Sequence, residues 1–279
     1  MTTAEKRGVV ETLRTDYSVR QIWDTLGFNR SSLYYEPKKD PSEEMLQQDI
    51  ENLSTRYPRY GYRRITELLV RMGYTVGYRR VARLMKSANL LVSVIHSCQT
   101  TKSLEGKCQW DNRLDNLDIC RRNQVWFADI TYVRLRGHFV YVSVLMDVFT
   151  RMIRGWQLCR HLTQPLTLRP QQQALRQSVP EIHHNDQGVQ YLSSEYISTL
   201  TDYGIEISLP HRGCPWENGY VGRFVQTLKE EEIHLNDYDD ITDAHTRIGQ
   251  FIEKVYNQKR AHSALGYLTP IEFEKEHLS

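Results

Sequence analysis

Apolar side chains recur at helical spacing through the first part of the chain. In residues 18–27 they stand three to four positions apart and end at Gly27, a pattern typical of a short helix. In residues 28–35, Asn29 or Ser31 can cap a second short helix. This order predicts a helix-turn-helix over residues 1–40. The residues at the head of its second helix, where base contacts are usual, are Arg30, Ser31 and Ser32.

A second helical unit is predicted over residues 41–96. A charged amphipathic stretch at 42–56 precedes apolar residues at helical spacing within 65–72 and within 81–85. Basic side chains are interleaved with tyrosines here, which favours contacts with phosphates, although a solvated helical bundle is an alternative. The basic residues that we expect to contact DNA are Arg59, Arg63, Arg64, Arg79, Arg80 and Lys86.

A pattern of strands and longer helices begins near residue 123. Three β-rich runs separated by short turns predict an antiparallel meander. Two short strands then alternate with helices, which predicts an α/β fold with helices on the faces of a sheet. The predicted strands are 125–133, 139–146, 151–158, 181–184 and 205–208. Two further predicted helices span residues 217–235 and 242–257.

Between the helical part and the strands, the chain is polar and shows no clear period, which is typical of a linker. The patterns therefore divide the chain into two helical DNA-binding units, a linker, an α/β core, and a C-terminal helix with a tail. The bounds of these five parts are 1–40, 41–96, 97–122, 123–238 and 239–279.

Charge is distributed unevenly over the 279 residues. Residues 1–100 carry 16 Lys and Arg against 11 Asp and Glu, whereas the remainder carries 20 against 23. A basic N-terminal part can hold a polyanion while the acidic body holds cations, although a chance fluctuation of surface charge is the alternative. The 40% apolar and 25% charged residues are an ordinary globular balance.

Several classes of protein are disfavoured. No apolar run approaches the roughly 20 residues that span a bilayer, and the first residues lack a secretory signal, so we expect a cytoplasmic protein without a membrane partner. Five cysteines without a closely spaced pair argue against a disulfide framework and a zinc ribbon. The adjacent pair His183 and His184 is interpreted as polar residues at a strand end rather than as zinc ligands.

Two carboxylates stand out by their positions in the predicted strands. Asp129 lies within an apolar strand, where an unpaired carboxylate is costly to bury. Asp186 ends a short strand, and Gly188 allows a tight turn after it. Carboxylates on neighbouring strands can share Mg²⁺ or Mn²⁺, and a metal pair can promote phosphoryl transfer. The alternatives are an arginine-paired residue at a sheet edge for Asp129 and a turn residue for Asp186.

Five stretches of the sequence together resemble one family. They are residues 57–64, 126–132, 184–191, 217–229 and 256–270. The chain resembles the transposases of bacterial insertion sequences that carry a retroviral-integrase-type core, and more narrowly their second-reading-frame product. The resemblance implies a ribonuclease-H-like core with a five-stranded mixed sheet, DNA strand transfer, two Mg²⁺ or Mn²⁺ ions, and a triad of two aspartates and a glutamate. Asp129 and Asp186 match the two aspartates.

The resemblance also implies partners and a place of action. Double-stranded DNA is expected as terminal inverted repeats and as target. A dimer or higher multimer is expected because both ends of an element must meet. The place of action would be the nucleoid in the bacterial cytoplasm.

The third acid of the family pattern is missing. In this family a glutamate follows the second aspartate with 35 residues between them, and that position is Gly222. Glycine supplies no oxygen ligand, and inside a helix it costs up to about 1 kcal/mol relative to alanine. Glu217 lies five residues earlier and would point about 140° away around a regular helix. We therefore expect a transposase with impaired cleavage; the alternatives are an inactive regulator that occupies transposon ends and a ribonuclease-H-like nuclease.

Four further residues are candidate DNA contacts. Asn218 and Lys229 share a polar helical stripe with Gly222, and Lys259 and Arg260 match the tail motif of the family. An ordinary solvated face is the alternative for each. Asp147 is interpreted as a partner of Arg151 or as a turn residue.

Overall fold

The computed structural model describes residues 3–27, 41–92, 110–135, 137–186, 188–211 and 214–277. The chain divides into two compact units, residues 1–52 and residues 53–279. The first unit contains α1 (Thr3–Leu13), α2 (Val19–Leu26) and most of α4 (Pro41–Arg56). The predicted helix at 18–27 is confirmed, and Gly27 follows it with a φ of +54°. The second predicted helix, with Arg30, Ser31 and Ser32, lies outside the described residues.

Two helices follow α4 and bury one apolar stripe each. These are α5 (Tyr62–Arg71) and α6 (Tyr78–Ser87), as the helical spacing predicts. Ile65 and Leu69 of α5, and Val81 and Met85 of α6, are completely buried. The turn between the helices contains Gly73 at a φ of +96°, which glycine adopts without strain.

The second unit is built on a five-stranded mixed sheet. Its strands are β1 (Val125–Leu135), β2 (His138–Asp147), β3 (Ile153–Cys159), β4 (Ile182–Asn185) and β5 (Glu206–Ser208). The order across the sheet is β3-β2-β1-β4-β5. The first three strands form an antiparallel meander, whereas β4 is parallel to β1 and β5 is parallel to β4. The predicted fold class, an α/β fold with a five-stranded mixed sheet, is confirmed.

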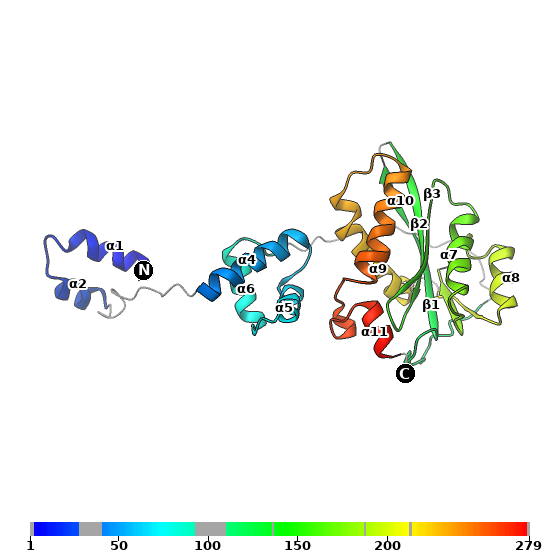
Figure 1. Ribbon diagram of the computed structural model, residues 1–279, viewed down its shortest axis with the longest axis horizontal. Helices are drawn as coiled ribbons and strands as arrows, with labels where there is room; N and C mark the ends of the chain where they lie inside the picture. The colour runs from blue at the N-terminus through cyan, green and yellow to red at the C-terminus, as the bar shows by residue number, and fades with distance from the viewer. Residues whose placement is uncertain are drawn as a thin grey trace. The chain divides into compact units, whose positions relative to one another are not determined.

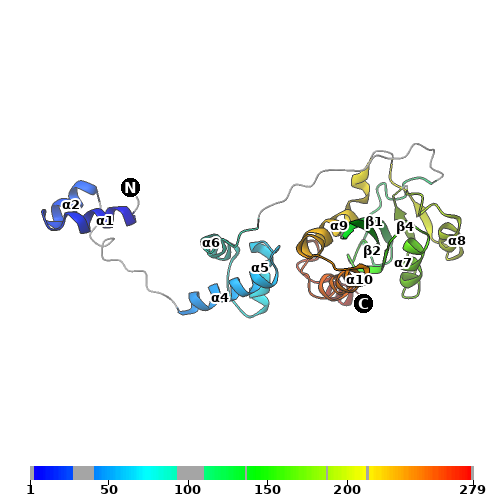
Figure 2. The same ribbon diagram turned by 90° about the horizontal axis from the view of Figure 1, so that it is seen from above.

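Helices cover both faces of this sheet, as Figures 1 and 2 show. On one side lie α7 (Pro165–Leu175) and α8 (Ser194–Asp202), and on the other lie α9 (Gly219–Glu231) and α10 (Ile241–Gln250). Alternate residues of β1 reach opposite faces: Phe127 packs in the α9 core and Trp126 in the α8 core. This two-sided burial explains why the first half of β1 is a continuous apolar run. The short helix α11 (Pro270–Glu276) ends the described chain.

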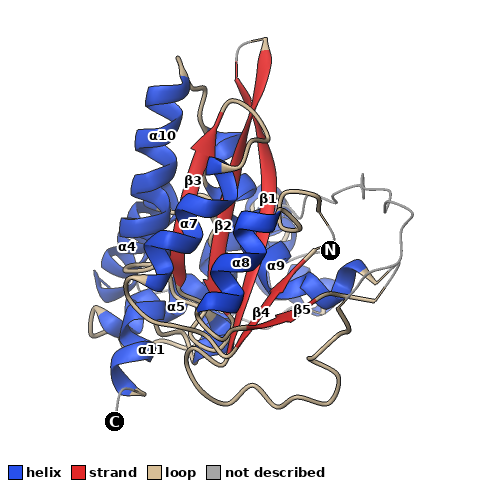
Figure 3. Cartoon of the chain, turned by 90° about the vertical axis from the view of Figure 1, so that its right-hand side faces the viewer, coloured by secondary structure: helices blue, strands red, loops and turns tan. Residues whose placement is uncertain are grey.

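The β1–β2 hairpin reaches beyond the two parallel strands (Figure 3). The last pair between β1 and β4 is Ala128 with Asn185, whereas β1 stays paired with β2 as far as Leu135. Residues 129–135 of β1 are therefore bonded to a strand on one side only. Asp129 is thus the first residue of β1 that has no pairing partner in β4.

Two predicted helices differ in their extent. The helix predicted over 217–235 is a 3₁₀ turn (Pro215–Asn218), then α9, then a second 3₁₀ turn (Ile233–Leu235). The helix predicted over 242–257 continues from α10 into a π-helical segment (Phe251–Tyr256). Both predictions were too regular, because the spacing of apolar residues does not distinguish an α-turn from a tighter or wider one.

The end of the predicted linker lies against the sheet domain. Leu114, Leu117 and Ile119 are partly buried and pack against the α9-side core. Residues 110–122 therefore share the core, so the linker would be shorter than the polar composition suggests. No helix of the described ranges is long and apolar enough to cross a membrane.

Candidate active site

Asp129 and Asp186 are brought together by the pairing of β1 with β4. Ala128 lies opposite Asn185 in this parallel pair, so Asp129 is the next residue of β1 and Asp186 is the first residue after β4. Neighbouring strands lie about 4.8 Å apart. The same face of the sheet carries Phe127 and His184, whose rings stack at a centroid distance of 4.6 Å. Two carboxylates that are 57 positions apart in the sequence thus become neighbours.

The surroundings of this pair disfavour two negative charges. Both side chains are half-buried. Burial and the charge of Asp186 raise the pKa of Asp129 to about 7, against a hydrogen bond from the Ile130 N–H at 2.8 Å. Burial also raises the pKa of Asp186, against a hydrogen bond from the Gly188 N–H at 3.1 Å. Adjacent carboxylates with so few donors suit a hard divalent cation, which needs oxygen ligands.

Helix α9 and the turn before it complete one wall of the site. The Asn218 amide nitrogen lies 3.5 Å from the Ala128 carbonyl oxygen, and the buried Asn218 Oδ1 has no partner within the described structure. The charge of Lys229 lowers the pKa of Asp129. Position 222 precedes Lys229 by two turns and points about 20° from it, so it lies on the same side of α9.

Gly222 occupies an open position on this stripe. A Cβ atom added there would meet nothing within 4 Å, and the residue does not adopt a positive φ. Neither packing nor backbone conformation therefore requires glycine. Across the described residues, no group of three or more His, Cys, Asp or Glu could hold a metal ion. The pair of aspartates accordingly lacks a third acidic ligand.

Glu217 is held away from this role by its own contacts. Its carboxylate accepts hydrogen bonds from the His211 N–H at 2.7 Å and the Asn112 amide at 2.9 Å, and it pairs with the His211 ring at 3.0 Å. Burial raises the pKa of Glu217, but the contacts with His211 outweigh it, so the net shift is downward. Because Glu217 lies in a 3₁₀ turn, the angle of about 140° expected from a regular helix does not apply to it. Its carboxylate nevertheless contacts Asn112 and His211.

The other predicted DNA contacts fall into different environments. Arg260 is buried, and its guanidinium donates to Glu231 at 2.8 Å, so we expect it to hold the tail rather than DNA. Lys259 is exposed, and Asn218 and Lys229 are half-buried. In the helical unit, Arg59 and Arg64 are half-buried. The exposed residues there are Arg63, Arg79, Arg80 and Lys86.

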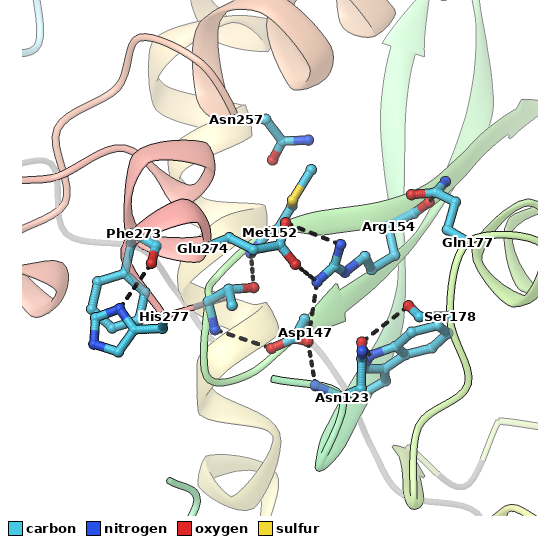
Figure 4. A network of polar contacts seen from close by, with 12 residues as sticks. Asn123, Asp147, Met152, Arg154, Gln177, Ser178, Asn257, Phe273, Glu274 and His277 are labelled. Atoms are coloured by element: carbon cyan, nitrogen blue, oxygen red, sulfur yellow. Dashed lines mark hydrogen bonds and ion pairs between the residues drawn. The ribbon is translucent and has the colours of Figure 1, made fainter. Parts of the chain in front are cut away.

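Asp147 belongs to a separate polar network (Figure 4). Its carboxylate accepts hydrogen bonds from the N–H groups of Asn123 at 2.8 Å and Thr150 at 3.0 Å, and it pairs with Arg154 at 3.5 Å. Arg154 also binds Glu274. The predicted turn role of Asp147 is confirmed, but the predicted partner is wrong. Strand pairing brings Arg154 of β3 to Asp147, whereas the guanidinium of Arg151 lies 4.0 Å from the Tyr220 ring centroid.

The two adjacent histidines also have protein partners. His183 contacts the Tyr196 hydroxyl at 2.7 Å, and His184 contacts the Ser208 hydroxyl at 2.9 Å. Burial lowers the pKa of His183 to about 3 and that of His184 to about 4, so both rings are neutral at pH 7. The sequence analysis did not connect His184 with the aspartates, although its buried ring stacks on Phe127 on the sheet face that carries them. Its place two residues before Asp186, on the same strand face, was an available signal.

Comparison with known proteins identifies the class. Integrase core domain models match residues 120–215 and 203–270, and the HTH-like domain model matches residues 41–96. The transposase for insertion sequence element IS904 of Lactococcus lactis is 32% identical over 85% of this chain and 96% of its own length. The putative transposase InsK for IS150 of Escherichia coli is 27% identical over 96% of this chain and 97% of its own length.

The chain belongs to the insertion-sequence transposases with an integrase core domain and an HTH-like domain. The resemblance read from the sequence is confirmed. Among solved structures, the HTLV-2 integrase catalytic core in complex with magnesium is similar at a TM-score of 0.45 and 20% identity, over 55% of this chain and 96% of that one. The BIV integrase catalytic core is similar at 0.44 and 18%, over 55% and 95%.

Proposed function

We propose that this transposase binds the ends of its insertion sequence and catalyses metal-dependent cleavage and strand transfer, at a rate impaired by Gly222. One observation carries the proposal. Strand pairing makes Asp129 and Asp186 neighbours at the open edge of β1, while α9 carries a glycine on the same side as Lys229, whose charge acts on Asp129. In this proposal position 222 is that of the third acid, and Gly222 supplies no carboxylate there.

Asp129 and Asp186 would hold the two divalent cations that we expect, Mg²⁺ or Mn²⁺. Such ions supply Lewis-acid activation of the attacking hydroxyl and neutralise charge on the phosphate. The environment of the aspartates fits a cation, because burial and then the charge of Asp186 raise the pKa of Asp129, and a bound cation would stabilise the charged form of both carboxylates. The protein contributes positioning, with Lys229 able to hold a phosphate beside Asp129.

Recognition of double-stranded DNA is assigned to the helical units. The exposed basic side chains of α5 and α6 would contact the phosphates of terminal inverted repeats, and Arg30, Ser31 and Ser32 would read bases. Lys259 and Asn218 are further candidates nearer the acids. A dimer or higher multimer would bring both ends together with target DNA, at the nucleoid in the bacterial cytoplasm.

The test is to restore the missing carboxylate. Gly222→Glu has room for its side chain, because the position is open. With Mg²⁺ and a duplex bearing the terminal repeats, we expect cleavage to rise by about a hundredfold or more, since a metal ligand acts on several kcal/mol of transition-state stabilisation. Cleaved 3′ ends would be quantified on denaturing gels.

Two variants isolate the carboxylate. Gly222→Gln has the same length without the charge and should remain as slow as the parent chain. Gly222→Glu combined with Asp129→Asn should lose the gain. A parent chain that cuts as fast as Gly222→Glu would refute the role assigned to position 222.

The second candidate function is a regulator that occupies transposon ends without cutting them. Gly222 favours it, because DNA binding does not need the third acid. End binding that survives chelation, with no cleavage by the parent chain in Mg²⁺ or Mn²⁺, would support the regulator. A nuclease indifferent to the sequence of the ends would contradict both candidates.

A further inference from the structure

Two half-exposed aromatic rings lie on the β1–β2 hairpin close to the acids. Tyr132 is 48% exposed and Phe139 is 51% exposed. Their ring centroids are 5.5 Å apart and their planes meet at 87°, an edge-to-face pair. In the strand pairing, Phe139 lies opposite Arg134 and Tyr141 lies opposite Tyr132. Tyr132 and Phe139 therefore belong to successive pairs on the same face of the sheet. The pair is therefore a preformed aromatic surface.

Figure 3 shows that the β1–β2 hairpin extends beyond β4, and Tyr132 belongs to this part of β1, past the last pair with β4. Beyond Ala128 the strand has no partner on the β4 side, and Tyr132 alternates with the buried Thr131 and Val133. Tyr132 follows Asp129 by three residues, which is about 10 Å along a strand, and the odd spacing puts its side chain on the opposite face of β1. The two are connected around the unpaired edge of β1 by Lys229, whose ammonium lies 4.5 Å from the Tyr132 ring centroid and whose charge acts on Asp129. A polymer that crosses this edge can therefore contact both the acids and the rings.

Positive charge connects the rings to the acids. The Lys229 ammonium lies 4.5 Å from the Tyr132 ring centroid, and the same ammonium stabilises the charged form of Asp129. Arg134, beside the rings, is exposed. Aromatic faces next to basic side chains are the combination by which proteins hold single-stranded nucleic acid, with bases on the rings and phosphates on the cations.

We propose that Tyr132 and Phe139 form a stacking surface for an unpaired nucleotide next to the phosphate held at the acids. This inference rests on the proposed function, which puts DNA across Asp129 and Asp186. The occupant is a nucleotide rather than a second copy of the chain, because two rings with adjacent cations suit a base and its phosphate. Two side chains are also too small a surface for a stable dimer, whose interface needs about 800 Å² from each partner.

The experiment uses the chain with Gly222 in place, so that binding is measured with little cleavage of the probe. The probes are a blunt duplex of the element end and the same duplex with a short single-stranded extension carrying 2-aminopurine. Tyr132→Ala should weaken binding of the extended duplex by about 5- to 150-fold, the range reported for loss of one stacked base. It should also abolish the fluorescence quenching of 2-aminopurine, while binding of the blunt duplex stays unchanged.

Matched variants control for folding and for ring chemistry. Tyr132→Phe keeps the ring and should preserve the quenching, and Phe139→Ala should weaken it. Tyr203→Ala removes a tyrosine that is 52% exposed at the end of α8 and should change nothing. Melting temperatures within a degree or so of the parent would show that the exposed side chains were removed without unfolding.

Three results would overturn the stacking surface. They are an equal loss for both probes, quenching that survives Tyr132→Ala, and a change of oligomeric state in sedimentation without a change in quenching. The last result would make the rings a self-association surface. If Gly222→Glu fails to restore cleavage while quenching still depends on Tyr132, the proposed function fails and the stacking surface stands.

Discussion

Asp147 and Asp129 lie on paired strands of the same sheet, but their carboxylates have opposite surroundings. Asp147 is completely buried and receives two backbone hydrogen bonds and an arginine. Asp129 is half-buried and receives one hydrogen bond, from the residue that follows it. The charge of Asp186 adds to burial in raising the pKa of Asp129, and burial also raises the pKa of Asp186.

The difference separates a structural carboxylate from a chemical one. A buried charge stabilises a fold only when donors and a counter-ion compensate it, as around Asp147. The aspartate pair is compensated only in part, by the N–H groups of Ile130 and Gly188 and by the charge of Lys229, and is therefore suited to an external cation. Burial alone does not distinguish these two cases, whereas the count of donors does.

The largest expected effect is the loss of stability when the carboxylate of Asp147 is removed. Asp147→Ala should lower the free energy of unfolding by about 3–5 kcal/mol, because it leaves the buried Arg154 and two backbone N–H groups with fewer acceptors. Urea unfolding followed by circular dichroism measures it. Asp129→Ala is the matched variant and should cost far less. Equal losses for the two variants would contradict the distinction.

A smaller effect is the pH dependence contributed by Asp129. Its folded pKa is raised to about 7, so the folded state retains a proton that the unfolded chain releases near its ordinary value of about 4. The unfolding free energy contributed by this group therefore falls as pH rises from about 4 to about 7. Asp129→Asn removes the charge and should match the parent at pH 4 but exceed it at pH 8.

Thermal melts at the two pH values check the sign. A gain of about 1 kcal/mol at pH 8 corresponds to about 2–4 °C for a domain of this size. Mg²⁺ at pH 8 should raise the melting temperature of the parent and leave Asp129→Asn nearly unchanged. A parent that is more stable than Asp129→Asn at pH 8 would mean that folding lowers the pKa of Asp129.

The smallest expected effect concerns the open position on α9. Gly222→Ala should stabilise the chain by up to about 1 kcal/mol, since alanine is the better helix former and its Cβ meets nothing. Gly249→Ala is the contrasting variant, because its Cβ would lie 2.7 Å from a ring carbon of Trp156, and it should destabilise. Denaturant midpoints measure both, and Gly222→Ala should not restore cleavage. A destabilised Gly222→Ala would reveal a structural need for glycine.

Local patterns predicted much of the fold. Alternation and β-rich composition indicated the meander, and helical spacing indicated α5, α6 and α9, because each pattern records which side of one element is buried. The two aspartates were identified from their positions in strands and from the family motif. Their roles in catalysis remain a prediction until the variants are measured.

Other features depend on residues that are distant in the sequence. Asp147 pairs with Arg154 of the neighbouring strand, although Arg151 is closer to it in the sequence. Folding of the tail buries Arg260 against Glu231. The 3₁₀ turn before α9 fixed the direction of Glu217, and β4 ended early enough to leave Tyr132 exposed. The sequence by itself determined the elements, the acids and the glycine at position 222. Only the tertiary structure decided which charges are compensated, because an electrostatic environment is set by spatial neighbours that periodicity does not record.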